Sequence, residues 1–273
     1  MEEHRDRVDG GDAPYAEGRE ARAARYVYCV ARAAQGLRLG PIGIEGREVY
    51  TAGDDDLCAV VHDGPPRPYQ SEDPETVAGW VLAHHRVVED AWSRWGSVLP
   101  VSFNTIIGPD RAGAEKDLAA WLALERDALT RRLAALAGKA EYGVQVSWDP
   151  AVVAAEAARS TPEIAGLGER MRAQSQGTAY LSLAKLRQLL RREVERRATA
   201  ECAALYRRIR GLVDDIRVER TVPSTSERQM LVNLSCLVSL DRAADLAMEV
   251  DAIGTVEGRF VHFVGPLPPY SFC

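Results

Sequence analysis

The chain closes on a strand that runs into a proline-rich tail: Phe260-Val261-His262-Phe263-Val264, then Gly265-Pro266-Leu267-Pro268-Pro269-Tyr270-Ser271-Phe272-Cys273. Proline lacks a backbone N–H and has its φ angle fixed, so three prolines in four positions exclude a helix or an inner strand. We therefore expect residues 265–273 to form an extended, stiff tail with a polyproline-like backbone.

The aromatic residues of this tail allow two interpretations. The tail could fold back and bury Tyr270 and Phe272 on its own domain, as docked termini do. Alternatively, it could be a preformed arm for a partner surface, because proline-rich segments lose little entropy on docking. The candidate residues for either role are Pro266, Pro268, Pro269, Tyr270 and Phe272.

The tail also carries a family resemblance. A strand leading into Gly-Pro-x-Pro-Pro-Tyr-Ser-Phe resembles the end of the gas vesicle protein F/L family, which usually has Trp at the position of Leu267. Further stretches are similar to that family in the expected order, so the resemblance spans roughly residues 25 to 273. They are Tyr26-Val27-Tyr28-Cys29-Val30, Val98-Leu99-Pro100-Val101-Ser102-Phe103-Asn104-Thr105, Ala137-Gly138-Lys139-Ala140-Glu141-Tyr142-Gly143-Val144 with Trp148-Asp149, and Ala179-Tyr180-Leu181 after Gly177.

The resemblance implies a non-enzymatic gas vesicle protein, either a minor structural component of the shell or an assembly factor. Such a protein would bind the small hydrophobic shell protein and support nucleation and growth of the vesicle. The implied partners are the shell protein and other gas vesicle accessory proteins, and the implied location is the gas vesicle in the cytoplasm. An assembly factor must hold an apolar client without aggregating, so its apolar patches should be small and rimmed by charge.

Composition places the chain among ordinary globular proteins. Its 273 residues are 46% hydrophobic and 27% charged, which suits one or two domains with a substantial core. The net charge of −6 argues against a nucleic-acid partner. No apolar run approaches the roughly 18 to 20 residues that cross a bilayer, and residues 1–7 lack the apolar segment of a signal peptide. We expect a cytoplasmic protein with neither a nucleic-acid nor a lipid-membrane partner.

The first half predicts a domain over residues 23–138, after a charged, glycine-rich segment at 1–22 that we expect to be disordered. Strands are predicted at 26–31, 48–52 and 57–62, followed by a helix from 71 to about 95. A strand at 98–107 and a helix from 111 to about 137 complete it. This order resembles a ferredoxin-like half that is modified at its start.

The second half predicts a domain over residues 139–264. A strand at 141–148, a short helix at 150–159 and a loop at 161–177 precede a helix from Thr178 to about Arg217. That helix would be about 40 residues long, roughly 60 Å. Strands at 218–222 and 230–240, a helix at 241–253 and a strand at 258–264 complete a β-α-β-β-α-β order. The predicted fold class is therefore α+β, with two domains and the tail of residues 265–273.

The sequence contains none of the common motifs of catalytic or cofactor-binding sites. It contains no phosphate-binding P-loop, dinucleotide-binding glycine motif, nucleophile elbow or zinc-binding HExxH helix. His85 and Glu89 lie one helical turn apart without further ligands at suitable spacing, and Asp54-Asp55-Asp56 lacks the alternating oxygens of a calcium loop. The five cysteines include no CxxC pair and are expected to be reduced, with Cys273 alone accessible. We expect no catalytic site, no metal site and no cofactor.

Arginine residues dominate the long helix. Acidic residues such as Glu193, Glu195 and Glu201 are interleaved with them, which is typical of a solvated helix face with i,i+4 pairing. The alternative is an electrostatic docking surface for an acidic partner. The candidates for that role are Arg191, Arg192, Arg196, Arg207 and Arg208.

Two other functions remain open. Two β-α-β-β-α-β-like halves could be tandem ferredoxin-like RNA-binding modules, and Phe260-Val261-His262-Phe263 equals the end of an RNP1 motif. The start of that motif is absent, because Val256-Glu257-Gly258-Arg259 stands in its place, and the protein is acidic. The second alternative is an unrecognised small-molecule enzyme of ferredoxin-like fold, which would reveal itself by a pocket with a strongly perturbed titrating group.

Overall fold

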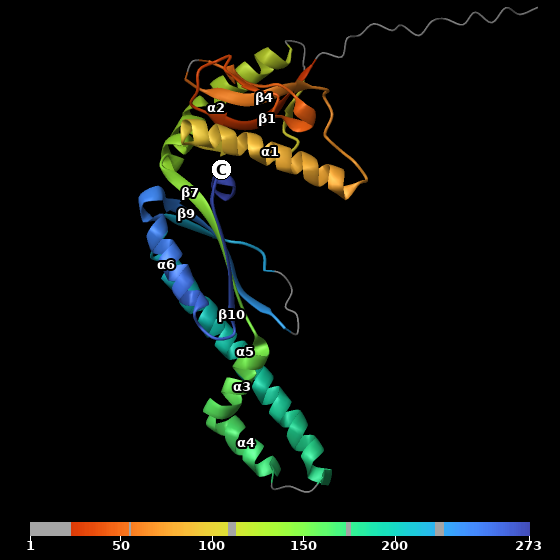
Figure 1. Ribbon diagram of the computed structural model, residues 1–273, viewed down its shortest axis with the longest axis vertical. Helices are drawn as coiled ribbons and strands as arrows, with labels where there is room; N and C mark the ends of the chain where they lie inside the picture. Colours follow the sequence, from red (N-terminus) through yellow and green to blue (C-terminus); the bar gives the residue numbers. More distant parts are fainter. Residues whose placement is uncertain (1–22, 55, 109–112, 173–175, 222–226) are drawn as a thin grey trace, which may run out of the picture.

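The computed structural model describes residues 23–273 except 55, 109–112, 173–175 and 222–226, so the expectation for residues 1–22 lies outside the described residues. Figure 1 shows an elongated molecule of two lobes, each built on an antiparallel sheet, with the C-terminus between them. We propose that these lobes are the two domains expected from the sequence, joined near Gly138.

The sheet of the first lobe is centred on β1 (Ala24–Ala31). β4 (Cys58–Gly64) pairs with one edge of β1, and the short β5 (Val98–Pro100) and β6 (Ile106–Ile107) pair with the other. β3 (Val49–Gly53) and β2 (Arg38–Gly40) extend the sheet beyond β4. The single strand predicted at 98–107 is thus split in two. The reason is a turn at Asn104, whose φ of 67° is one that asparagine tolerates better than most residues.

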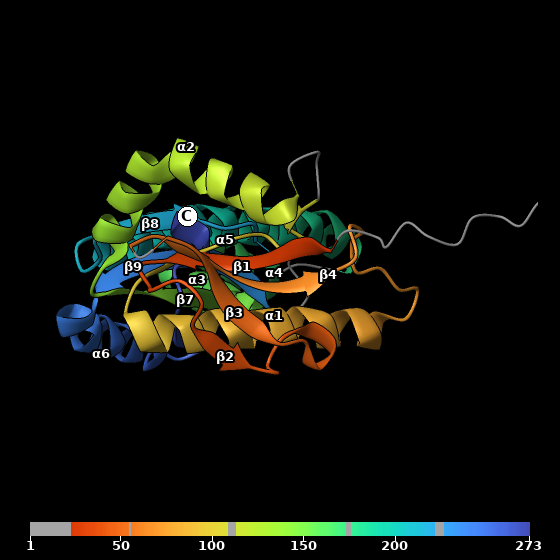
Figure 2. The ribbon, with the colours of Figure 1, turned by 90° about the horizontal axis from the view of Figure 1, so that it is seen from above.

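Two long helices enclose this sheet, as Figure 2 shows from above. α1 (Pro74–Trp95) covers one face and contacts Tyr26 and Tyr28, whereas α2 (Ala114–Leu136) covers the other and contacts Val27 and Val30. Capping explains where α1 begins, because the carboxylate of Asp73 accepts bonds from the first free N–H groups of the helix. α1 ends at Gly96, which has a left-handed conformation. The short η1 turn (Ile44–Gly46) packs against α1.

The second lobe has a four-stranded sheet with β7 (Lys139–Trp148) inside it. β10 (Arg259–Leu267) pairs with one side of β7 and β9 (Gln229–Ser239) with the other, and β8 (Asp215–Val218) follows β9. α5 (Gln176–Arg210) and α6 (Ala243–Gly254), which follows a short η2 turn (Leu240–Arg242), cover one face. The order β7, α5, β8, β9, α6, β10 is β-α-β-β-α-β. A ferredoxin-like fold for the first lobe stays a prediction, since four strands precede its first helix.

Two predictions for the second half are wrong in detail. The expected loop at 161–177 contains a helix, α4 (Pro162–Arg172), because Ile164 and Leu167 lie one turn apart and are buried. α4 and α3 (Pro150–Ser160) pack against the first half of α5 and form the far end of the molecule in Figure 1. α5 has 35 residues instead of about 40, because the chain leaves the helix at Gly211 and residues 215–218 pair with β9.

Candidate interaction surfaces

The tail of residues 265–273, here called the arm, lies between the two lobes (Figure 1). Its first three residues continue β10 at the edge of the sheet, with Leu267 opposite Glu141, so the exclusion of an inner strand agrees with the structure. The prediction that all of residues 265–273 are extended is wrong at the end of the arm, where Tyr270–Phe272 form a short 3-10 turn, η3. The φ angle of Gly265 is 137°, and a Cβ atom there would lie 2.5 Å from Cδ1 of Tyr142. Only glycine therefore lets the arm pass so close to β7.

The middle of the arm binds the first lobe through an aromatic pair. The hydroxyl of Tyr270 lies 2.8 Å from Nδ1 of His85 on α1, and Nε2 of His85 lies 3.2 Å from the carboxylate of Glu89. Since a carboxylate only accepts, Nε2–H of His85 donates to Glu89, and Nδ1 accepts a hydrogen bond from the hydroxyl of Tyr270. Burial raises the pKa of Tyr270 well above its usual range. The pair His85 and Glu89, noted in the sequence as two residues one turn apart, thus anchors the arm.

The next residue of the arm binds the second lobe. Ser271 donates from its backbone N–H and its hydroxyl to the two carboxylate oxygens of Glu141, at 2.7 and 2.6 Å. Its hydroxyl also lies 3.1 Å from that of Ser235 on β9. Glu141 is only 7% exposed, and a buried carboxylate is costly unless it is hydrogen-bonded. The arm therefore supplies two hydrogen-bond donors to the buried carboxylate of Glu141.

The end of the arm packs at the junction of the lobes. Phe272 and Cys273 contact a core cluster that joins α2 to Leu237 of β9, and the guanidinium of Arg217 lies 5.4 Å from the ring centre of Phe272. Cys273 was expected to be accessible, but it is half-buried, and burial raises the pKa of its thiol to about 12. Of the candidate prolines, Pro268 and Pro269 are buried and Pro266 is exposed. This geometry favours the tail-docking interpretation, while partner binding stays a prediction.

The candidate arginines of α5 fall into two groups. Arg208 pairs with Glu249 on α6, and Arg196 pairs with Glu193 at 2.7 Å. Arg191, Arg192 and Arg207 are exposed and have no ion-pair partner in the described part of the chain. The five candidates therefore do not form one uniform surface. Their role as an electrostatic docking site stays a prediction.

A buried cluster of tyrosines and histidines escaped the sequence analysis. Beneath α1, the hydroxyl of Tyr26 lies 2.9 Å from Nδ1 of His84, and that of Tyr28 lies 2.7 Å from Nδ1 of His62. Burial lowers the pKa of both imidazoles to about 4, and the positive charge of Arg47 contributes at His62. Burial likewise raises the pKa of Tyr26 to about 12. The alternation of Tyr26 and Tyr28 along β1 was the available signal for this cluster.

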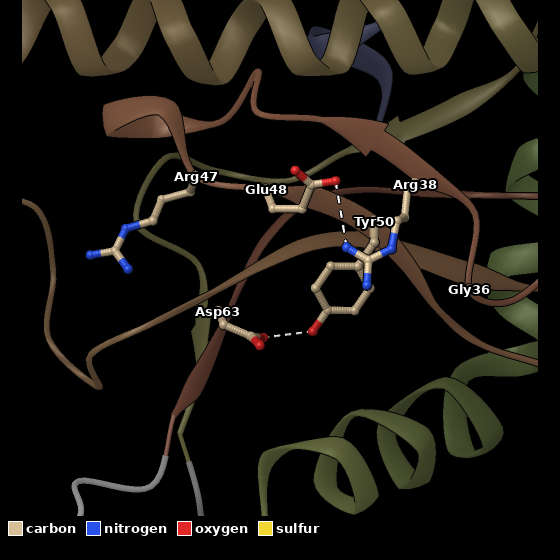
Figure 3. Close-up of a pocket in the computed structure, with 6 residues that line it drawn as sticks. All are labelled: Gly36, Arg38, Arg47, Glu48, Tyr50 and Asp63. Carbon is tan, nitrogen blue, oxygen red and sulfur yellow. Dashed lines mark hydrogen bonds and ion pairs between the residues drawn. The ribbon is translucent and has the colours of Figure 1, made fainter.

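A surface hollow of 440 Å³ lies at the β2–β3 side of the first sheet and is drawn in Figure 3. Its charges are largely satisfied within it: Arg38 lies 3.6 Å from Glu48, and the hydroxyl of Tyr50 donates to Asp63 at 2.6 Å. Burial and the Asp63 contact raise the pKa of Tyr50 well above its usual value.

Ligand and membrane features can be assessed over the described ranges. No group of three or more His, Cys, Asp or Glu residues there could hold a metal ion. The cysteines are free thiols, buried at Cys29, Cys58 and Cys236 and half-buried at Cys202 and Cys273. Within those same ranges, none of the helices is both long enough and apolar enough to cross a membrane.

Comparison with known proteins gives consistent relatives. The family described as "Gas vesicle synthesis protein GvpL/GvpF" matches residues 24–273. Gas vesicle protein L1 of Halobacterium salinarum is 28% identical over 280 residues, covering 100% of this chain and 98% of that protein. Gas vesicle protein F of Streptomyces sp. (strain CB03234) is 31% identical over 251 residues, covering 90% of this chain and 98% of its own.

Solved structures agree at the level of the fold. The crystal structure of gas vesicle protein GvpF from Anabaena sp. PCC7120 superposes with a TM-score of 0.70 at 17% identity, covering 92% of this chain and 98% of that one. GvpF from Microcystis aeruginosa gives a TM-score of 0.63 at 18% identity, over 91% and 98% of the two chains. The mixed α+β fold with two antiparallel sheets is thus shared, and the family match over residues 24–273 establishes that the chain belongs to the gas vesicle GvpL/GvpF family.

Proposed function

We propose that this protein is a non-catalytic accessory component of gas vesicles in the cytoplasm. In this proposal it binds the small hydrophobic shell protein, works alongside other gas vesicle accessory proteins, and supports nucleation and growth of the vesicle as a minor structural protein or assembly factor. The observation that carries the proposal is the family match over residues 24–273, together with relatives that align over nearly their whole length.

The amino-terminal part of α1 is the surface that this proposal assigns to the apolar client. Val81 and Leu82 are 44% and 54% exposed, and they follow Ala78 and Gly79, which are also exposed. Trp80 of the same helix lies in the wall of a hollow of 460 Å³. The residues lining this hollow are Glu45, Arg47, Pro65, Arg67, Pro68, Tyr69, Gln70 and Trp80. A small apolar patch with charges at its rim is what an assembly factor needs to hold a client and still stay soluble.

The alternatives receive less support from the structure. β10, which carries the partial RNP1 match, is an edge strand and the last strand of its unit rather than the third. Val256-Glu257-Gly258-Arg259 also stands where that motif begins, so the match covers only its second half. For an enzyme, the perturbed groups are the tyrosines and histidines of the core under α1, where burial, rather than a reactive partner, is the largest cause of each pKa shift.

Co-expression with the small shell protein tests the proposal. We expect the shell protein to copurify with this chain without detergent, and we expect Leu82→Asp to reduce its recovery roughly tenfold by placing a charge on the client surface. Leu124→Asp is the matched control, because Leu124 is 82% exposed but lies on α2, on the opposite side of the sheet (Figure 2).

The possible outcomes separate the parts of the proposal. Absence of any association while both proteins remain soluble would contradict shell-protein binding altogether. Equal losses from Leu82→Asp and Leu124→Asp would contradict the α1 surface while leaving the binding itself intact. Measuring the melting temperature of each variant shows whether a loss comes from unfolding.

A further inference from the structure

The outer edge of β10 is an unprotected strand edge. β10 is the last strand on its side of the sheet, and no strand in the described part of the chain pairs with that edge. The run Phe260-Val261-His262-Phe263-Val264 contains no Asp, Glu, Lys or Arg, and Phe260 and Val264 are 39% and 37% exposed. Edge strands usually carry charge, proline or a covering segment that blocks further pairing. The five-residue window Phe260–Val264 lies between Arg259 and Gly265-Pro266, and it contains no Asp, Glu, Lys, Arg or Pro that would block pairing.

The hydrogen-bond phase of β10 identifies which backbone groups point outward. The N–H of Asp149 donates to the carbonyl of Gly258 at 2.8 Å, so residue 258 bonds toward β7. Along an antiparallel strand, the backbone groups of successive residues point alternately toward the partner strand and away from it. The register has no shift between Gly258 and His262, which lies opposite Gln145, so every second residue from Gly258 onward bonds β7. Val261 and Phe263 therefore present their N–H and C=O groups at the free edge, while Phe260, His262 and Val264 use theirs to bond β7.

The sequence of the window is complementary to itself in the antiparallel direction. We propose that a second copy of this chain pairs with β10 across a twofold axis at His262, joining the two four-stranded sheets into one. In this register Val261 bonds Phe263 of the other copy, and Phe260 lies opposite Val264. Pairs of an aromatic and a β-branched residue are among the favourable cross-strand neighbours. A twofold contact repeats each of them.

Other registers are poorer. Moving the axis to Val261 places Arg259 opposite Phe263 and His262 opposite Phe260. Moving it to Phe263 sets Phe260 against Pro266, which lacks an N–H. Only the axis at His262 uses all five residues of the window, with the two histidines beside each other on the face of the sheet away from the helices. The window is thus matched better to its own copy than to an arbitrary apolar strand.

The helix layer leaves room for this pairing. α6 lies over β10, with Gly254 packed on Val261, and α5 lies on the far side of α6, where Arg208 pairs with Glu249. Each sheet has four strands about 4.8 Å apart and carries two helices, so each helix covers the width of two strands. In the joined sheet α6 and its symmetry mate would therefore lie about 9 to 10 Å apart, which is an ordinary distance between packed helices. The flank of α6 opposite Glu249 carries Ala244, Ala247 and Asp251. The two alanines permit this close approach.

A cysteine at the axis tests the geometry directly. In a non-hydrogen-bonded pair the Cα atoms of the two residues at position 262 would lie about 4.5 Å apart, so we expect His262→Cys to form a disulfide-linked dimer under mild oxidation. Gln145→Cys is the control: it lies beside His262 on the same face, but its copies would be about 14 Å apart, too far for a disulfide. The unmodified chain, with Cys202 and Cys273 half-buried, gives the background.

A variant that lacks one backbone N–H group at the free edge of β10 tests the proposed dimer without a crosslink. Val261→Pro deletes an N–H that β7 does not use, so each monomer keeps its ladder while the dimer loses two hydrogen bonds. We expect sedimentation to show twice the 29.9 kDa mass for the parent and for Val261→Thr. For Val261→Pro we expect a dissociation constant at least about tenfold higher.

Several results would overturn the inference. One is a parent chain that stays monomeric at about 100 μM, ten times a dissociation constant of about 10 μM, with no crosslink from His262→Cys. Another is a dimer that tolerates Val261→Pro, or in which Gln145→Cys crosslinks as readily as His262→Cys. A monomer that loses shell-protein binding on Val261→Pro would show that the edge takes a client strand rather than a second copy.

Discussion

At the residue scale, the buried histidines of the first lobe make stability depend on pH. His62 and His84 are 0% and 4% exposed, and each bonds a tyrosine hydroxyl under α1. Their pKa values fall from 6.5 to about 4 in the folded protein, chiefly through burial. A base with a lowered pKa binds fewer protons when folded than when unfolded. Its stabilising contribution is therefore complete above pH 6.5 and is lost as the pH falls toward 4.

We predict that the free energy of unfolding falls between pH 7 and pH 4, with each imidazole costing roughly 2 kcal/mol at pH 5. Denaturant titrations across this range measure the slope. Replacing His62 or His84 by Gln should flatten it. Carboxylates such as Glu193, whose pKa is lowered to about 2 by its arginine partners, act only below pH ~4.5. An unchanged slope in the His62 and His84 variants would show that other groups cause it.

At the element scale, α5 illustrates how one helix serves two environments. Its second half lies over the sheet, where Leu205 and Ile209 are 0% exposed. Its first half extends beyond the sheet and packs against α3 and α4, and Leu190 there is half-buried. The ion pairs of Arg197 with Glu156 of α3 and of Arg208 with Glu249 of α6 lie along its sides. The exposed side carries Arg192 and Arg207.

We predict that Leu205→Asp destabilises the second lobe by several kcal/mol, about 4, because it buries a charge without a partner. Leu190→Asp should cost less, since the half-buried side chain can turn toward water. Arg207→Glu, only two residues from Leu205, should change the unfolding free energy by less than about 0.5 kcal/mol. Chemical denaturation of the three variants makes the comparison. Equal damage from Leu205→Asp and Arg207→Glu would mean that the buried side of α5 is wrongly assigned.

At the scale of the whole molecule, the arm holds the lobes together. Tyr270 bonds His85 in the first lobe, and Ser271 bonds Glu141 in the second, so consecutive residues connect the two. Trp92 of α1 also packs against the core of the second lobe, and Leu237 of β9 belongs to the core beneath α2. The lobes therefore share a continuous apolar junction, and the arm closes one side of it.

Deleting residues 268–273 tests this role. We predict a clearly lower melting temperature, because two aromatics worth very roughly 2 kcal/mol each are removed and Glu141 loses its donors. The double variant Tyr270→Ala, Phe272→Ala should reproduce most of the loss. Arg207→Ala, at an exposed position on α5, is the control and should leave the melting temperature nearly unchanged.

Shell-protein binding separates the two interpretations of the arm. If the arm is structural, binding by the truncated protein should return at temperatures where it is still folded. An unchanged melting temperature with binding abolished would instead identify the arm as a docking segment for the partner. A truncation that affects neither property would contradict both interpretations.

Much of the fold followed from local pattern in the sequence. The apolar run of β1, the capped start of α1 at Asp73 and the glycine-free interior of α5 are local features, and each produced its element near the predicted position. Predictions failed where long-range contact overrode local preference. α4 forms in an expected loop because two of its side chains are buried, and residues 215–218 leave the helix to pair with β9.

The sequence by itself determined the family and the α+β composition, because motif order and residue periodicity are properties of neighbouring residues. Only the tertiary structure decided where the tail goes. His85 and Glu141 are separated from it by 185 and 130 residues, and no local pattern links positions so far apart. The same holds for the cluster of Tyr26, Tyr28, His62 and His84, and for the open edge of β10. Each exists only once sheets and helices have brought distant residues together.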